Sequence, residues 1–217
     1  MYSNHLPKSS DINGPDAISV GSGNGEELYL SVIIVNYNGL SFLEACLQAL
    51  SRNVSCPHEI IVVDNNSSDG SSVYISKVWP DVRLICSPDN LGFAKGNNLG
   101  AEYARGRYLL LLNNDTEILE ALQPLLDYFE DHPDTAVVGG RLRNPDGSIQ
   151  ASVGHDHAPF RLLFTWMLLR TCAWASSWQI FERRPEFYQH THREVHWVSG
   201  AFLCIRRRTW QELAGFD

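Results

Sequence analysis

The sequence predicts an α/β domain: a mostly parallel, Rossmann-like sheet flanked by helices, in a chain of 217 residues. Short apolar runs alternate with segments of helical periodicity, which is the pattern of strands joined by right-handed helical crossovers. The apolar runs are unbroken rather than alternating with polar residues, as in parallel strands covered on both faces. A chain of this length buries enough apolar surface for one such domain.

The expected elements follow in order. Strands are expected at residues 29–35, 59–63, 82–86, 108–112 and 136–140. A helix opens at Ser41, where Glu44 completes a capping box, and further helices cover 71–78, the stretch to about residue 104, and 122–130. The first helix has one apolar face, made of Leu43, Cys46, Leu47 and Leu50.

The pattern changes after residue 140. The sequence Asn-Pro-Asp-Gly at 144–147 predicts a hairpin between 141–143 and 149–152. Residues 195–205 have the character of a strand broken at 199–200, and Thr209 with Glu212 predicts a second capping box that opens a short helix. The apolar, aromatic segment 160–180 is expected to be a lid on the core, with an interfacial membrane helix as the alternative.

Composition and charge limit the classes of function that the chain can have. The net charge of −8 argues against a nucleic-acid binder. Residues 1–140 contain 7 Lys and Arg against 18 Asp and Glu, whereas residues 141–217 contain 10 against 7, so the second part is expected to meet an anionic surface or substrate. Five cysteines without a C-x-x-C spacing, and a disordered tail at 1–27 without a signal peptide, predict a cytoplasmic location.

Polar side chains follow the expected strands where each strand ends, at 36–38, 64–69, 90–98 and 113–115. The carboxyl ends of parallel strands meet at one edge, where open α/β sheets bind ligands. Asn and Asp there supply donors and acceptors for a nucleobase and ribose, and Gly92 and Gly96 let the backbone approach a ligand closely. No P-loop motif is present.

Asp115 follows the most apolar of the expected strands. Its carboxylate is expected to hold Mg²⁺ or Mn²⁺, since one carboxylate plus substrate phosphates is a common arrangement for a hard cation. The alternative is that residues 113–116 are only a turn, in which Asp115 or Thr116 caps the next helix.

Five segments, in this order, resemble the family 2 glycosyltransferases, which have the GT-A fold: SVIIVNYNG at 31–39, EIIVVDNNSSDGS at 59–71, NLGFAKGNN at 90–98, YLLLLNNDT at 108–116 and WVSGAFLCIRRRTWQELAGFD at 197–217. The forms LNNDT, VSGAF and GFD are most similar to the rhamnosyltransferase-like branch. The resemblance implies an inverting enzyme that moves a sugar from a UDP- or dTDP-sugar donor to a saccharide or lipid-linked saccharide in cell-surface polysaccharide synthesis. It implies a GT-A domain at 28–217, with a nucleotide-sugar-binding half at 28–140 and an incomplete acceptor-side half at 141–217.

Positions that match the family's motifs carry implied roles. Nucleotide contacts are implied for Asn36, Tyr37, Asp64, Asn66, Asn90, Gly92, Lys95, Asn98 and Asn114. The residue that matches Asp64 meets the pyrimidine and accepts its imide N–H. LNNDT stands where the family has a D-x-D metal motif, with Asn113 in place of the first Asp, so the metal rests mainly on Asp115. Gly200 and Ala201 match the acceptor-side segment.

The catalytic base implied by the family is an Asp downstream of GFD, beyond Asp217, the last residue. We therefore expect donor binding but slow transfer, and fraying at Asp217. The alternatives are a non-catalytic nucleotide-sugar-binding fragment or pseudoenzyme, and a sugar-1-phosphate nucleotidyltransferase, whose G-x-G-T-R-L loop is missing. Contact of 160–180 and the basic run 206–208 with anionic lipid would make the chain peripheral on the inner face of the cell membrane.

Overall fold

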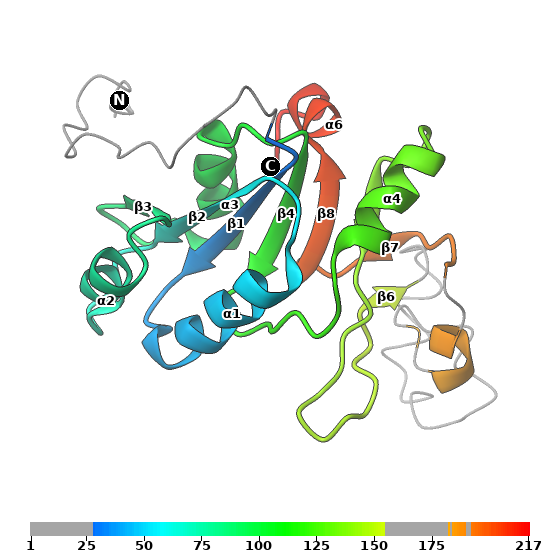
Figure 1. Cartoon of the computed structure of the whole chain (residues 1–217), viewed down its shortest axis with the longest axis horizontal. Helices are drawn as coiled ribbons and strands as arrows, with labels where there is room; N and C mark the ends of the chain where they lie inside the picture. The colour runs from blue at the N-terminus through cyan, green and yellow to red at the C-terminus, as the bar shows by residue number, and fades with distance from the viewer. Residues whose placement is uncertain (1–27, 155–181, 183, 190–191) are drawn as a thin grey trace, which may run out of the picture.

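The computed structural model describes residues 28–154, 182, 184–189 and 192–217. Within them a six-stranded sheet has the order β3-β2-β1-β4-β8-β5 (Figure 1). Its strands are β1 Leu30–Asn36, β2 His58–Asp64, β3 Arg83–Cys86, β4 Tyr108–Asn113, β5 Val137–Gly139 and β8 Phe202–Arg206. Because only β8 runs antiparallel to its neighbours β4 and β5, the predicted α/β fold with a mostly parallel sheet is confirmed.

Helices cover both faces of this sheet. They are α1 Leu40–Asn53, α2 Ser71–Val78, α3 Gly92–Glu102, α4 Gln123–Asp131 and α6 Arg207–Glu212, with a 3₁₀ turn at Pro185–Gln189. Figure 1 shows α1 and α4 on the near side and α3 on the far side. Val32 and Ile34 pack in the cluster with α1 and α4, whereas Ile33 packs in the cluster on the α3 and α6 side. Both faces of β1 are therefore buried, which explains its unbroken apolar run.

The two predicted capping boxes are wrong. Helix α1 begins at Leu40 without a side-chain cap from its own sequence. Instead Asp69, from the loop after β2, accepts the Leu40 N–H at 2.9 Å. Helix α6 begins at Arg207, and Glu212 pairs with Arg208 at 2.8 Å rather than with the backbone. A partner brought close by the fold thus replaced the local cap at α1.

The region after residue 140 departs further from expectation. The turn at 144–147 is present, with the Gly147 N–H donating to the Asn144 carbonyl at 2.9 Å, but its arms share only the bridge between Arg143 and Ile149. The break predicted at 199–200 is confirmed, since β7 (Trp197–Val198) ends before it and β8 begins after it. The two pieces lie in different sheets: β7 pairs with β6 (Val153–Gly154) in a second small sheet, and β8 joins the main sheet. The expected lid, 160–180, lies outside the described residues.

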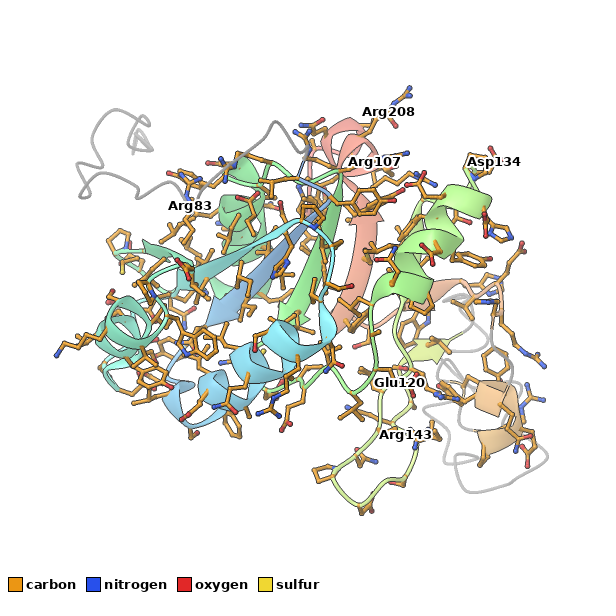
Figure 2. All side chains as sticks on the ribbon, in the orientation of Figure 1. Arg83, Arg107, Glu120, Asp134, Arg143 and Arg208 are labelled. Carbon is orange, nitrogen blue, oxygen red and sulfur yellow. The ribbon has the colours of Figure 1, made fainter. Side chains whose placement is uncertain are left out.

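A polar network closes the edge where β1 and β4 begin. The hydroxyls of Tyr29 and Tyr108 donate to Glu130 at 2.5 and 2.7 Å, and the Arg107 guanidinium lies 3.0 Å from the same oxygen (Arg107 is labelled in Figure 2). Arg206 donates to the Tyr108 hydroxyl at 3.2 Å and to three backbone carbonyls near the end of α4. These hydrogen bonds from Tyr29 and Tyr108 lower the pKa of Glu130. Every charged group of this network thus has a partner.

Candidate functional site

The carboxyl ends of the parallel strands form a pocket of about 230 Å³, as the strand-end prediction requires. We call it the strand-end pocket; its lining residues are Val35, Tyr37, Asn65, Asn90, Gly92, Phe93, Asn113 and Asn114. They come from the ends of β1, β2 and β4 and from the start of α3. Four of the predicted nucleotide contacts, Tyr37, Asn90, Gly92 and Asn114, therefore share one cavity.

Asn36 joins three strand ends without lining the pocket. It is fully buried, and its Nδ2 donates to Asp64 Oδ1 at 3.1 Å while its Oδ1 accepts from Asn114 Nδ2 at 2.8 Å. A Cβ on Gly39 would stand 2.5 Å from the Asn36 oxygen and would also collide with Asn114, so only glycine leaves room for this chain of amides. Asn36 thus positions the loops that form the pocket wall.

Asp64 is also buried, with 3% of its surface exposed. Its Oδ1 accepts from Asn36, and its Oδ2 accepts from the Ser67 N–H at 3.2 Å. Burial first, and the charge of Asp64 second, raise the pKa of the Cys86 thiol beside it. Asn66, two residues further on, is exposed with a φ of 64° and does not line the pocket. The base contact predicted for Asp64 and the contact predicted for Asn66 stay predictions.

Two predicted contacts on α3 lie outside the pocket lining. Lys95 is exposed and makes no ion pair among the described residues. Asn98 holds the backbone of Phe216: its Nδ2 donates to the Phe216 carbonyl at 2.8 Å, and its Oδ1 accepts the Phe216 N–H at 2.9 Å. A nucleotide contact from Asn98 would break this pair. Phe216 is therefore held through both its N–H and its carbonyl, and the fraying expected at Asp217 stays a prediction.

Asp115 is exposed just beyond β4, and within the described residues its carboxylate has no hydrogen bond or ion pair. Burial, and then the charges of Asp115 and Glu117, raise the pKa of Cys46 to about 12. The turn expected at 113–116 in the alternative interpretation is present, with the Thr116 N–H donating to the Asn113 carbonyl at 3.2 Å. The helix cap expected from Asp115 or Thr116 is wrong, since the next helix begins at Gln123.

The donor atoms near Asp115 suit a hard cation. Asp115 adjoins Asn113 and Asn114, so the side chains here offer oxygen rather than sulfur or imidazole. Over the part of the chain that the structure describes, no group of three or more His, Cys, Asp or Glu is gathered for a metal. A site with one protein carboxylate is the kind that Mg²⁺ occupies together with substrate phosphates.

Gly200 and Ala201, the predicted acceptor-side residues, adjoin the strand-end pocket through Phe93. The Ala201 carbonyl accepts the Asn113 N–H at 3.0 Å, which ties this segment to the end of β4. A Cβ on Gly200 would stand 2.7 Å from the Phe93 ring, and Phe93 packs against Phe216 with 5.8 Å between ring centroids. Phe93 therefore forms a wall shared by the pocket and the segment at 200–201.

Sequence reasoning missed three residues of this site: Gly39, Asn65 and Phe93. Gly39 lies two residues after the predicted contact Tyr37, Asn65 stands between the predicted contacts Asp64 and Asn66, and Phe93 lies inside the polar stretch 90–98. A glycine directly after a strand-end Asn is a signal that could have found Gly39, because such positions permit close approach. No sequence pattern separates Asn65 from Asn66, since only the fold decides which one is buried.

A second cavity of about 270 Å³ offers less chemistry. It is lined by Ile149, Ala151, Glu182 and Tyr188. The Arg184 guanidinium donates two hydrogen bonds, of 2.7 and 3.0 Å, to the Glu182 carboxylate. The negative charge of Glu182 is therefore already paired. The strand-end pocket, which gathers four asparagines, is the better candidate site.

A mostly parallel sheet with helices on both faces and a polar pocket at its carboxyl edge is consistent with the predicted GT-A fold. The model of the family described as glycosyl transferase family 2 matches residues 31–208. The chain belongs to this family, and the resemblance seen in its motifs is confirmed.

Comparisons with individual proteins agree with this family assignment. The chain is 28% identical over 211 residues to the N-acetylglucosaminyl-diphospho-decaprenol L-rhamnosyltransferase of Mycobacterium tuberculosis, covering 87% of this chain and 64% of that protein. It is similar in fold to S. aureus TarS in complex with UDP (TM-score 0.50, 22% identity, 58% of this chain and 39% of that one). It is also similar to the mannosyltransferase PcManGT of Pyrobaculum calidifontis in complex with GDP-Man and Mn²⁺ (TM-score 0.55, 17% identity, 89% and 48%).

Proposed function

We propose that the chain carries the donor-binding part of an inverting glycosyltransferase that uses a UDP- or dTDP-sugar, with rhamnose as the sugar. The observation that carries the proposal is the strand-end pocket, lined by asparagines and by the half-exposed ring of Tyr37. Amide groups supply the donors and acceptors that a base and ribose need, and an exposed aromatic ring supplies a stacking surface. The UDP complex of TarS supports a nucleotide in this class of site.

Groups beside the pocket suit the diphosphate. Helix α3 begins at Gly92, a pocket residue, and the amino terminus of a helix favours an anion. Lys95, one turn into α3, has a free ammonium group that can approach the phosphates. Asp115 would hold Mg²⁺ or Mn²⁺, which supplies further positive charge to the leaving group; the Mn²⁺ complex of PcManGT supports this assignment.

The acceptor is proposed to be a saccharide or lipid-linked saccharide that enters beside Gly200 and Ala201. In inverting transfer the acceptor oxygen attacks the anomeric carbon as the bond to the diphosphate breaks, and a base takes the proton of the acceptor hydroxyl. Phe93 stands between the pocket and this segment, where it would shield the reacting carbon from water. The mycobacterial relative, an N-acetylglucosaminyl-diphospho-decaprenol L-rhamnosyltransferase, supports a lipid-linked saccharide as the class of acceptor.

A non-catalytic nucleotide-sugar-binding role is the second candidate. One observation favours it: none of the described residues that line the strand-end pocket is an Asp or Glu. A base within hydrogen-bond reach of the acceptor is required for efficient transfer, and its loss costs about 10²–10⁴-fold in rate. A transfer assay of this chain beside a version extended through an acidic pair distinguishes the two roles, since comparable turnover by both would show that residues 1–217 contain the base.

Contact with an anionic membrane has weaker support. No helix among the described residues is long and apolar enough to cross a bilayer. Of the basic run 206–208, Arg206 is committed to the network at the end of α4, and Arg208 pairs with Glu212. Membrane contact would therefore depend mainly on 160–180, which lies outside the described residues. Co-sedimentation with anionic liposomes at low salt tests it.

The test of the proposed function is calorimetric titration with UDP, dTDP, CDP, GDP and ADP in the presence of Mn²⁺. We expect UDP or dTDP to bind most tightly, because an imide N–H is common to uracil and thymine and absent from cytosine. Tightest binding of GDP or ADP would overturn the pyrimidine assignment. Binding of none of the five would overturn the proposed function itself.

A further inference from the structure

Asn65 carries a polar atom that the protein leaves without a partner. The residue follows β2, is 1% exposed, and lines the strand-end pocket. Its backbone N–H donates to the Asn36 carbonyl at 2.7 Å, and its Nδ2 donates to the Gly92 carbonyl at 3.1 Å. Its Oδ1 has no hydrogen-bond partner among the described residues. Buried polar atoms nearly always form a hydrogen bond, so we expect Asn65 Oδ1 to accept one from a bound molecule.

The orientation of the Asn65 amide is fixed by its surroundings. Exchanging its oxygen and nitrogen would set two acceptors, Oδ1 and the Gly92 carbonyl, against each other. Helix α3 also packs closely here: a Cβ on Gly96 would stand 2.8 Å from Val35 and 3.3 Å from Asn65 Nδ2. The side chain therefore has little room to turn, and the acceptor keeps one direction.

The neighbouring carboxylate of Asp64, unlike Asn65, has no unused acceptor oxygen. Both oxygens of Asp64 already accept a hydrogen bond, and Asp64 does not line the pocket. Asn65 is thus the described residue at the end of β2 that combines a place in the pocket lining with an unused acceptor.

We propose that Asn65 Oδ1 accepts a hydrogen bond from the nucleoside part of the bound nucleotide and so contributes to donor specificity. The partner must be a neutral donor, either the ring imide N–H or a ribose hydroxyl. The diphosphate is excluded because its ionised oxygens only accept. This inference rests on the proposed function, which supplies the nucleotide.

The test is a set of calorimetric titrations with UDP, 3-methyl-UDP, 2′-deoxy-UDP and 3′-deoxy-UDP, each of the last three lacking one donor of the nucleoside. The proteins are the wild type, Asn65→Ala and the control Asn97→Ala. Asn97 is equally buried, and its amide donates to the Phe93 carbonyl at 2.9 Å, so its loss removes a comparable bond from the same turn.

We expect one analogue to bind wild type about tenfold more weakly than UDP, because it leaves a buried acceptor unpaired. In Asn65→Ala, UDP and that analogue should bind equally, whereas Asn97→Ala should keep the tenfold difference. If circular dichroism shows that Asn65→Ala is unfolded, Asn65→Ser replaces it in the same titrations, because the serine side chain is also too short to place an acceptor at the position of Oδ1.

Equal losses in wild type and Asn65→Ala for all three analogues would overturn the inference while leaving the proposed function intact, and would indicate that an ordered water meets Oδ1. Failure of wild type to bind UDP at all, or any other nucleoside diphosphate, would remove the proposed function and this inference together.

Discussion

The two ends of the central strands are built differently. Where β1 and β4 begin, Tyr29, Tyr108 and Arg107 converge on Glu130, and every charged group has a partner. At the opposite edge of the sheet, where β1, β2 and β4 end, Asn65 after β2 has an unmet acceptor and Asp115 after β4 has no partner, both among the described residues. The first end uses its polar groups to hold α4 on the sheet, and the second leaves polar groups for a ligand. Substitutions at the first should therefore change stability, and substitutions at the second should change binding.

The largest expected effect is that of Glu130→Ala on stability. It removes the acceptor of two tyrosine hydroxyls, one on the fully buried ring of Tyr108, so the free energy of unfolding should fall by about 2 kcal/mol. The exposed ion pair with Arg107 adds little. Urea unfolding measures the change, and UDP affinity should stay at the wild-type value.

Glu120→Ala, at an exposed residue without a partner in the described structure, is the control (Figure 2). An unchanged urea midpoint in Glu130→Ala would show that the network is not stabilising.

Asp115→Ala should show the reverse pattern. In Mn²⁺ it should weaken binding of UDP by about tenfold, because the cation loses its protein carboxylate. In chelator the variant and wild type should bind equally, and urea unfolding should differ by less than about 0.5 kcal/mol, as for an exposed residue without partners. Equal affinity of both proteins in Mn²⁺ would remove Asp115 from the site.

Gly200→Ala should have a smaller effect, which lowers both the stability of the fold and the affinity for UDP. The added Cβ would meet the Phe93 ring at 2.7 Å, so the ring must shift, at a cost of about 1 kcal/mol. Since Phe93 lines the pocket, UDP affinity should fall a few-fold as well. The double variant Phe93→Leu with Gly200→Ala should recover most of the lost stability. A double variant no more stable than Gly200→Ala would show that the contact with Phe93 is not the cause.

The smallest expected effect is a pH dependence at Glu130. Hydrogen bonds from Tyr29 and Tyr108 lower its pKa below the ordinary value of 4.5, so its contribution to stability is present above pH 4.5 and is lost as the pH falls through the lowered pKa. The difference in unfolding free energy between wild type and Glu130→Gln should therefore shrink between about pH 5 and pH 3. A difference that stays constant over this range would mean that Glu130 is not ionised in the native protein.

The sequence predicted well both the sheet and the polar edge that carries the pocket, for a physical reason. Strands buried on both faces need continuous apolar runs, and polar residues after such runs must lie at one edge. It could not decide between neighbouring residues at a strand end: Asp64 ends β2 and Asn65 follows it, yet of these two only Asn65 lines the pocket. It also missed partners distant in the chain, such as the cap that Asp69 gives to α1 and the pairing of Asn98 with Phe216. Those contacts depend on how loops meet in space.

The position of β8 in the sheet has a consequence for the order of folding. Strands β1 to β4 pair with one another and are complete once residue 113 has been synthesised. Among the described strands β5 pairs only with β8, more than sixty residues later in the chain. Until β8 inserts, one edge of β4 stays open, and β5 has no place in the sheet. Such a late, non-local pairing slows folding and exposes strand edges to other chains. We therefore expect newly made protein to aggregate most readily in the interval between the completion of β4 and the arrival of β8.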